Sequence, residues 1–386
     1  NLCTNQSKEV KPNSAEDKYI NDADIKSDSI YLNVGKRLNE KNKIRFLIDK
    51  FKKNKKGKRA EGNLAGNYLS QKSAVETKKD RYAFKWDYES LDKDPLLKSL
   101  KAKTYYQNLH TSDLWLEQYS KGISYPKVSD YHLYDEMYGF EFQFGSLFEN
   151  HLFTYGIDYS LTKNQYFQDK YEIINGLNNP YVDNTKYPIK RSPDSETIRL
   201  GLYLQDEVSY GDYDFIGGIR FDNYKLNPLP DPTYLEYCDE EGGGKNCKVE
   251  DLDIPNWSPK IGITRELNNN LEIWGQYSMG FKAPTWWQLQ STHRNCSVSP
   301  KYQSIPNSDL KSERSNSYEI GLRGDYERYK FQLVGFYNTY IDFIEGGEIK
   351  DYERKKSGDA KLICNIDNKN EDELVLEGES QENQET

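Results

Sequence analysis

The stretch Ile198–Gln205 reads IRLGLYLQ, and the alternation in it decides the fold class. Its four aliphatic residues occupy every second position, while Arg199, Gly201, Tyr203 and Gln205 occupy the positions between them. Side chains of an extended chain point to opposite faces in turn, so a period of two places the aliphatic residues on one face. The stretch therefore predicts a β-strand with one apolar and one polar face.

The same alternation recurs along most of the chain. It is clear in LEIWGQYSMGF from Leu271 and in YEIGLRGDY from Tyr318. Similar segments are Ser29–Leu38, Lys43–Phe51, Arg81–Tyr88, Leu97–Leu109, Tyr138–Leu147, His151–Thr162, Tyr213–Leu226, Trp257–Leu267 and Tyr329–Phe343. The pattern predicts about twelve strands, several of them near the roughly 9–11 residues that cross a bilayer at a tilt.

The predicted connections between these strands alternate in length. Short polar turns are expected at Asn39–Asn42, Gly211–Asp212 and Asn268–Asn270. Long polar connections are expected at Lys52–Lys79, His110–Asp135, Lys163–Ser195, Asn227–Pro255 and Lys282–Arg314. Short turns on one side and long loops on the other are typical of bacterial outer-membrane barrels. We therefore expect an all-β fold, a transmembrane antiparallel β-barrel.

The polar faces of the predicted strands carry full charges. Examples are Arg199, Arg220, Asp222, Glu272, Glu319 and Arg323. A narrow barrel would bury these groups at a high cost in free energy, whereas a wide barrel exposes them to water or to a plug. An open soluble sheet or a solenoid with one wet face has the same period, so periodicity alone leaves that alternative open.

The composition agrees with a half-wet β surface. Of the 386 residues, 35% are hydrophobic and 14% aromatic, and 32 are tyrosines, which fit pleated and interfacial surfaces. The net charge of -9 argues against a nucleic-acid partner, which needs a basic face. No apolar run of about 18 residues occurs, so no transmembrane helix is expected.

The five cysteines form no CxxC pair. Cys238 and Cys247 flank DEEGGGKN, a flexible stretch that a disulfide would close into a small ring. Such a disulfide would imply an oxidising compartment, and two free surface thiols are the alternative. Cys296 and Cys364 are a second candidate pair, although no spacing rule requires their pairing.

No catalytic motif stands out. GxSxG, HExxH, Walker A and Rossmann glycine patterns are all missing, so we expect no enzyme. The sequence begins with Asn and shows no signal peptide, which is typical of a mature form or a fragment. We expect a barrel region over residues 1–345 and a polar, acidic tail or loop over 346–386.

Two short motifs frame the longest aromatic-containing connection. The first is GFKAPT, which contains Phe281, Lys282, Ala283 and Pro284, and the second is PNSDLKSE, which contains Asn307, Ser308, Asp309 and Leu310. Their order and spacing resemble the paired boxes of TonB-dependent outer-membrane receptors. The haem and haemoglobin receptors of that family carry an FRAP-like box, a loop with a histidine and an NPNL-like box. His293 lies between the two motifs here.

The resemblance extends from about Leu97 to Glu345. GLYLQDEV, GGIRFDNYKLNP, WSPKIGIT and GFYNTYIDFIE are similar to barrel strands of the same family. Two positions depart from the boxes, because Lys282 stands where the first box has arginine and Ser308 stands where the second has proline.

The resemblance implies a haem or haemoglobin receptor of the Gram-negative outer membrane, energised through the TonB complex. Family barrels have about 22 strands around a plug, so about twelve strands amount to a partial barrel. The sequence shows no plug segment for TonB to act on. The partners implied are TonB, host haemoglobin or another iron protein, and outer-membrane lipid. Haem would be the transported ligand, and no permanently bound cofactor is expected.

The resemblance also implies candidate site residues. His293 would ligate haem iron, and Tyr302 is a second candidate because tyrosinate ligates haem iron too. Trp286 and Trp287 would stack on a porphyrin or pack on a partner protein. The alternatives are a solvated loop histidine and two tryptophans that anchor the rim in lipid headgroups.

Three functions remain open at this point. The first is the haem or haemoglobin receptor. The second is a transferrin, lactoferrin or siderophore receptor of the same superfamily. The third is a surface or secreted adhesive β protein without transport.

Overall fold

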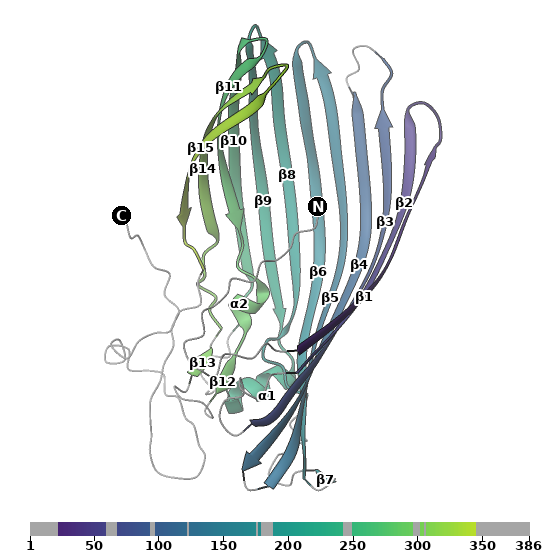
Figure 1. Cartoon of the computed structure of the whole chain (residues 1–386), viewed down its shortest axis with the longest axis vertical. Coiled ribbons are helices and arrows are strands. Elements are labelled where there is room, and N and C mark those ends of the chain that lie inside the picture. Colours follow the sequence, from purple (N-terminus) through teal and green to yellow (C-terminus); the bar gives the residue numbers. More distant parts are fainter. Residues whose placement is uncertain are drawn as a thin grey trace, which may run out of the picture.

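The computed structural model describes residues 22–58, 68–92, 97–121, 123–174, 177–178, 188–241, 249–295, 302–304 and 306–344. Within these residues twelve strands pair in chain order in one antiparallel sheet, and a short further strand, β7, pairs with β6. The sheet bends into a curved wall (Figure 1). The expected all-β fold with about twelve antiparallel strands is confirmed.

Most of the long strands are joined by short turns at one end of the wall and by longer segments at the other, with β4 and β5 as an exception because their pairing continues to Lys121 opposite Ile123. They are β1 (Asp22–Arg37), β2 (Asn42–Lys58), β3 (Tyr68–Glu89), β4 (Ser99–Lys121), β5 (Ile123–Phe148), β6 (His151–Ile174), β8 (Asp194–Tyr210), β9 (Tyr213–Leu229), β10 (Leu252–Asn268), β11 (Leu271–Lys282), β14 (Glu313–Asp325) and β15 (Lys330–Ile341). The shorter elements are β7 (Leu177–Asn178), α1 (Pro232–Glu241), α2 (Trp286–Gln290), β12 (His293–Asn295) and β13 (Tyr302–Ser304). The end of the wall near α1, α2, β12 and β13, low in Figure 1, is called the long-connection end below.

All five predicted long connections contain strand residues, and in three of them the long strands extend far beyond the predicted ends. The sequence predicts loops at Lys52–Lys79, His110–Asp135 and Lys163–Ser195, but the strands continue into all three segments. Between β4 and β5 the pairing runs unbroken from Ser99 opposite Gly145 to Lys121 opposite Ile123. The alternation fades there because polar side chains occupy both faces, whereas the backbone ladder does not depend on side-chain polarity. With 26 residues, β5 is roughly 85 Å long, far more than the ~30 Å of a hydrocarbon core.

Two cross-strand rows mark where the apolar outer face ends. The first row is Ile48, Tyr82, Tyr106, Tyr138, Leu161 and Ile198, and the second is Lys50, Asp80, Asn108, Glu136, Lys163 and Glu196. Tyr106 and Tyr138 donate their hydroxyls to Glu136 at 3.0 and 2.7 Å. Amphipathic rings of this kind belong at a membrane surface. The bilayer therefore ends at these boundary rows, and the long-connection end lies beyond them.

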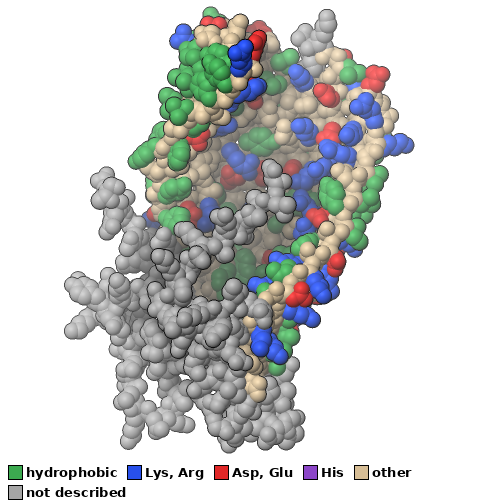
Figure 2. Space-filling view, viewed as in Figure 1, with side chains coloured by type: hydrophobic (Ala, Val, Ile, Leu, Met, Phe, Trp, Pro, Cys, Tyr) green, Lys and Arg blue, Asp and Glu red, His purple; other side chains and the backbone are tan. Residues whose placement is uncertain are grey.

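The opposite face of the wall carries the charges. Figure 2 looks onto this hollowed face, where Lys, Arg, Asp and Glu side chains gather. Arg220 forms ion pairs with Asp158 at 2.8 Å and with Asp222 at 2.7 Å. A Cβ on Gly201 would lie 2.1 Å from Nη2 of Arg220, so this glycine makes room for the guanidinium. The charged positions of the alternating pattern thus face the lumen, where they pair with one another.

The wall is open among the described residues. The strand order runs from β1 to β15, and each of these two strands pairs on one side only. Large apolar side chains of β15 are correspondingly exposed, such as Phe336 at 73%. The described sheet is therefore a partial barrel. No helix within the described ranges has the length and apolar character needed to cross a membrane.

A small apolar cluster lies at the long-connection end. Tyr224 and Leu226 of β9 pack there with Leu289 of α2, and all three are at most 4% exposed. Leu252, Ile254, Ala283, Trp286 and Leu310 pack against them. The cluster fixes α2 to the wall, whereas many of the large apolar side chains of the sheet lie on its exposed outer face.

One of the predicted disulfide cysteines lies in the described part of the chain. Cys238 of α1 is 1% exposed and disulfide-bonded. Cys247, Cys296 and Cys364 lie outside the described residues, so both predicted pairings stay predictions. The acidic segment 346–386 lies outside them as well, and the boundary at residue 345 also stays a prediction.

Candidate ligand-binding site

The two sequence boxes lie side by side at the ends of β11 and β14. Lys282 donates to both carboxylate oxygens of Glu313, at 2.9 and 3.0 Å, and thereby ties the two strand ends together. Ala283 of the first box and Leu310 of the second both pack on the apolar cluster. The charge of Lys282, which stands at the arginine position of the box, thus holds the entry and exit of the connection together.

The sequence between the boxes starts with a capped helical turn. Thr285 is the N-cap of α2, and it forms a reciprocal capping box with Gln288. The carbonyl of Leu289 accepts a hydrogen bond from the Asn307 N–H at 2.9 Å, so the second box also holds the helix. The five-residue helix is therefore fixed by its cap, by the second box and by Leu289 in the apolar cluster.

The two tryptophans of α2 have different surroundings. Trp286 packs on the apolar cluster. Trp287 is 37% exposed and meets the ring of Tyr166 from β6 edge to face, with ring centroids 4.8 Å apart. Trp287 therefore contacts the face of β6 that lines the lumen, and whether the two tryptophans hold a ligand or anchor the rim stays a prediction.

His293 is half-buried and contacts α1. Its Nδ1 lies 3.1 Å from the hydroxyl of Tyr237. Burial, together with the positive charge of Arg191, lowers the pKa of His293 from 6.5 to about 4. The imidazole is therefore neutral at physiological pH, which is the form that ligates metals. The surroundings differ from those of the solvated loop histidine that the sequence left as an alternative.

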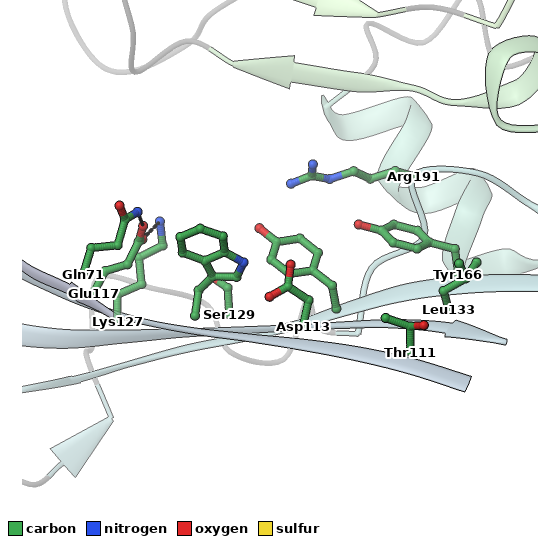
Figure 3. A pocket seen from close by; sticks show the side chains of 11 residues that line it. Gln71, Thr111, Asp113, Glu117, Lys127, Ser129, Leu133, Tyr166 and Arg191 are labelled. Carbon is green, nitrogen blue, oxygen red and sulfur yellow. Dashed lines mark hydrogen bonds and ion pairs between the residues drawn. The ribbon is translucent and has the colours of Figure 1, made fainter. Parts of the chain in front are cut away.

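A pocket of about 560 Å³ opens on the lumen face of β4, β5 and β6, beyond the boundary rows. Figure 3 shows its aromatic wall, with Arg191 across the cavity from the strands. The wall includes Trp115, Tyr131 and Tyr166, and the guanidinium of Arg191 lies 5.8 Å from the centroid of the Tyr131 ring. Burial raises the pKa of Tyr166 to about 12, so its hydroxyl stays protonated.

This pocket adjoins the residues expected from the sequence. Tyr166 contacts Trp287, and the Arg191 carbonyl accepts a hydrogen bond at 2.6 Å from the N–H of Thr292, the residue before His293. For Tyr302 the structure describes the backbone, which pairs with Asn295 between β13 and β12. The structure thus places Trp287 and His293 next to the pocket and Trp286 behind them in the apolar cluster.

Sequence reasoning missed the pocket residues themselves. Trp115 and Tyr131 fall in the segment His110–Asp135, and Tyr166 and Arg191 fall in Lys163–Ser195, both of which the sequence assigns to loops. No motif links these segments, because their neighbourhood depends on the pairing of β4 with β5 and of β5 with β6. The density of aromatic residues in 110–135 was the available signal.

A wall of long antiparallel strands with apolar residues outside and ion pairs inside defines an outer-membrane β-barrel protein. Residues 18–352 match the family described as "TonB dependent receptor-like, beta-barrel". The chain belongs to this family. Its members are transport receptors of the Gram-negative outer membrane and not enzymes.

Relatives and solved structures agree with this assignment. The chain is 25% identical over 195 residues to a "Probable hemoglobin and hemoglobin-haptoglobin-binding protein 3" of Haemophilus influenzae, a match that covers 49% of this chain and 17% of the relative. It is 33% identical over 135 residues to a "Probable TonB-dependent siderophore receptor PirA" of Acinetobacter baumannii, covering 33% of this chain and 17% of the relative. The fold is similar to that of the "Copper transporter OprC", with a TM-score of 0.53 at 11% identity over 84% of this chain and 53% of that one. The matched stretches thus span about a sixth of each relative.

The low pKa of His293 makes a direct prediction. Between pH 6.5 and about pH 4, the imidazole of His293 is protonated in the unfolded chain but not in the folded chain. The free energy that holds His293 in its buried position therefore falls as the pH drops from 6.5 to about 4. We expect the imidazole resonance of His293, assigned with a His293→Gln variant, to titrate near pH 4 in micelles. A midpoint at or above pH 6 would contradict the buried position.

Proposed function

We propose that this chain is part of a receptor that takes up haem, from haemoglobin or another host iron protein, with energy supplied through TonB. The family assignment supports a TonB-dependent receptor. A relative named for haemoglobin binding supports the haem source. The observation that carries the proposal is a neutral histidine, His293, held between two boxes next to an aromatic pocket.

His293 has the chemistry that an iron ligand needs. Nδ1 of His293 lies 3.1 Å from the Tyr237 hydroxyl, and a neutral imidazole is the form that binds haem iron. A partner on the far nitrogen orients a ligating histidine and raises its basicity. Tyr237 would therefore position the imidazole, while Trp287 and Tyr166 would contact the porphyrin ring.

A His293→Ala variant of the complete receptor tests the proposal. We expect its affinity for haem, followed through the Soret band in detergent, to fall by at least about 10–100-fold, which is the loss that removing only an outer-shell partner of a metal ligand causes. His151→Ala is the matched control, because His151 lies at the short-turn end of β6 and pairs with Asp206 at 2.8 Å. The control should bind haem like the unaltered receptor.

The competing candidate is a siderophore receptor, which the PirA relative favours. Titration of the unaltered receptor with ferric siderophores and with iron-loaded transferrin separates these cases from haem. Saturable binding of a ferric siderophore without binding of haem would refute the haem proposal and leave the family assignment intact. The secreted adhesive protein has no support from the family match.

A further inference from the structure

The pocket on β4 to β6 combines flat aromatic surface with the guanidinium of Arg191, whose buried Nε has no hydrogen-bond partner among the described residues. Trp115 of β4, Tyr131 of β5 and Tyr166 of β6 line the same space. Figure 3 shows Tyr166 on the strand side and Arg191, from the segment before β8, across from the strands. Aromatic rings present large flat faces that favour planar conjugated ligands. The volume of about 560 Å³ lies within the range of ordinary small-molecule sites.

Two polar atoms of this pocket are buried without a hydrogen-bond partner in the described structure. They are Nε of Arg191 and Oδ1 of Asp113. Buried polar atoms normally have partners, and leaving one unpaired costs free energy. The guanidinium of Arg191 lies over the face of Tyr131, which offers no hydrogen-bond acceptor to Nε. A group that enters the pocket and accepts hydrogen bonds would supply what Arg191 lacks.

We infer that this pocket holds a planar conjugated ligand that carries a carboxylate, with the carboxylate on the guanidinium of Arg191 and the ring against Trp115 and Tyr131. The inference rests on the proposed function, in which the ligand is haem and the carboxylate is one of its propionates. A guanidinium donates two parallel hydrogen bonds to a carboxylate, and this charge-assisted pair is stronger than neutral hydrogen bonds.

The carboxylate of Asp113 determines how the ligand is oriented in the pocket. Its carboxylate lies on the strand side of the pocket, and Arg191 lies on the other side (Figure 3). Two carboxylates close together repel each other. The propionate therefore sits at Arg191 and away from Asp113. Removing the negative charge of Asp113 strengthens binding of an acidic ligand, whereas removing the positive charge of Arg191 weakens it.

The pocket also connects to the proposed iron ligand. The carbonyl of Arg191 accepts a hydrogen bond at 2.6 Å from the N–H of Thr292, the residue before His293. Trp287, which lies in the same connection between β11 and β14 as His293, contacts the ring of Tyr166. Arg191 is therefore a specificity-determining residue that selects ligands with a carboxylate at the edge of the ring.

The test uses the complete receptor and two probes, ferric protoporphyrin IX and its dimethyl ester, which differ only in the two propionate charges. We expect the unaltered receptor to bind the diacid about 10–100-fold more tightly than the diester, the range given by a charge-assisted hydrogen-bond pair. Arg191→Gln should remove this preference by weakening the diacid alone. Asp113→Asn should strengthen binding of the diacid and leave the diester unchanged.

Arg199→Gln is the matched control. Arg199 also lies over a tyrosine on the lumen face, 5.5 Å from the Tyr224 ring centroid, but it does not line the pocket. Equal affinity of the unaltered receptor for diacid and diester would overturn the inference, whatever the variants do, and would leave the haem proposal standing. Failure to bind either probe would instead refute the proposed function.

Discussion

Leu202→Arg is expected to lower the free energy of unfolding from lipid vesicles by about 2–4 kcal/mol. Leu202 is 43% exposed on the outer face of β8, among the aliphatic residues that begin at Ile198. A guanidinium at this position would have to enter hydrocarbon, where it loses its hydration. The measurement is the reversible unfolding by urea of the complete receptor in lipid vesicles, monitored by tryptophan fluorescence.

Gln205→Arg is the control on the opposite face of the same strand. Gln205 donates to Glu207 at 2.8 Å on the lumen side, so an arginine there would meet water and a carboxylate. We expect a change within about 0.5 kcal/mol, as for ordinary exposed substitutions. Equal losses for the two variants would show that the faces do not differ in their surroundings.

Leu289→Ala is expected to weaken the attachment of α2 to the wall by about 3 kcal/mol, because it removes a buried side chain from a small cluster. Leu289 is 4% exposed, and its cluster partners Tyr224 and Leu226 come from β9. The helix has only five residues, so its own hydrogen bonds cannot hold it without this packing. Haem binding should fall with it, since α2 places Trp287 beside the pocket.

Hydrogen exchange measures this local effect. The amides of Leu289 and Ser291 donate to Thr285 and Trp287 at 3.2 and 3.1 Å, and we expect them to exchange roughly 100-fold faster in Leu289→Ala, as that free energy implies. The amides of β9 should be unchanged. Leu235→Ala in α1 is the control, because that leucine is 42% exposed and should leave both amides protected.

The membrane part of the fold was predictable from residues such as those of Ile198–Gln205, because lipid on one side and water on the other impose a period of two. The extension beyond the membrane was not predictable in this way. Around His110 and His132 both faces of the sheet are wet, so no alternation separates strand from loop. The backbone ladder between β4 and β5 holds that region together, and a ladder leaves little trace in side-chain order.

The residues of the candidate site also fall into some that the sequence identified and some that it did not. His293 and Trp287 were found because they lie between two boxes that a family resemblance identifies. Tyr131 and Arg191 were not found, because sixty positions of sequence separate them and only the pairing of β5 with β6 and the return of the chain to β8 bring them together. A cation over an aromatic ring has no sequence signature when its two members come from distant segments.

The claim on which everything else depends is that alternate residues of each strand face lipid and lumen. Nitroxide labels placed one at a time at positions 198 to 205 of the receptor in bilayers test it through collisions with oxygen and with a water-soluble nickel chelate. We predict that oxygen dominates at 198, 200, 202 and 204, and that the nickel chelate dominates at the positions between them. Nickel access at the first set, or shielding of that set from both reagents by another protein layer, would contradict the account.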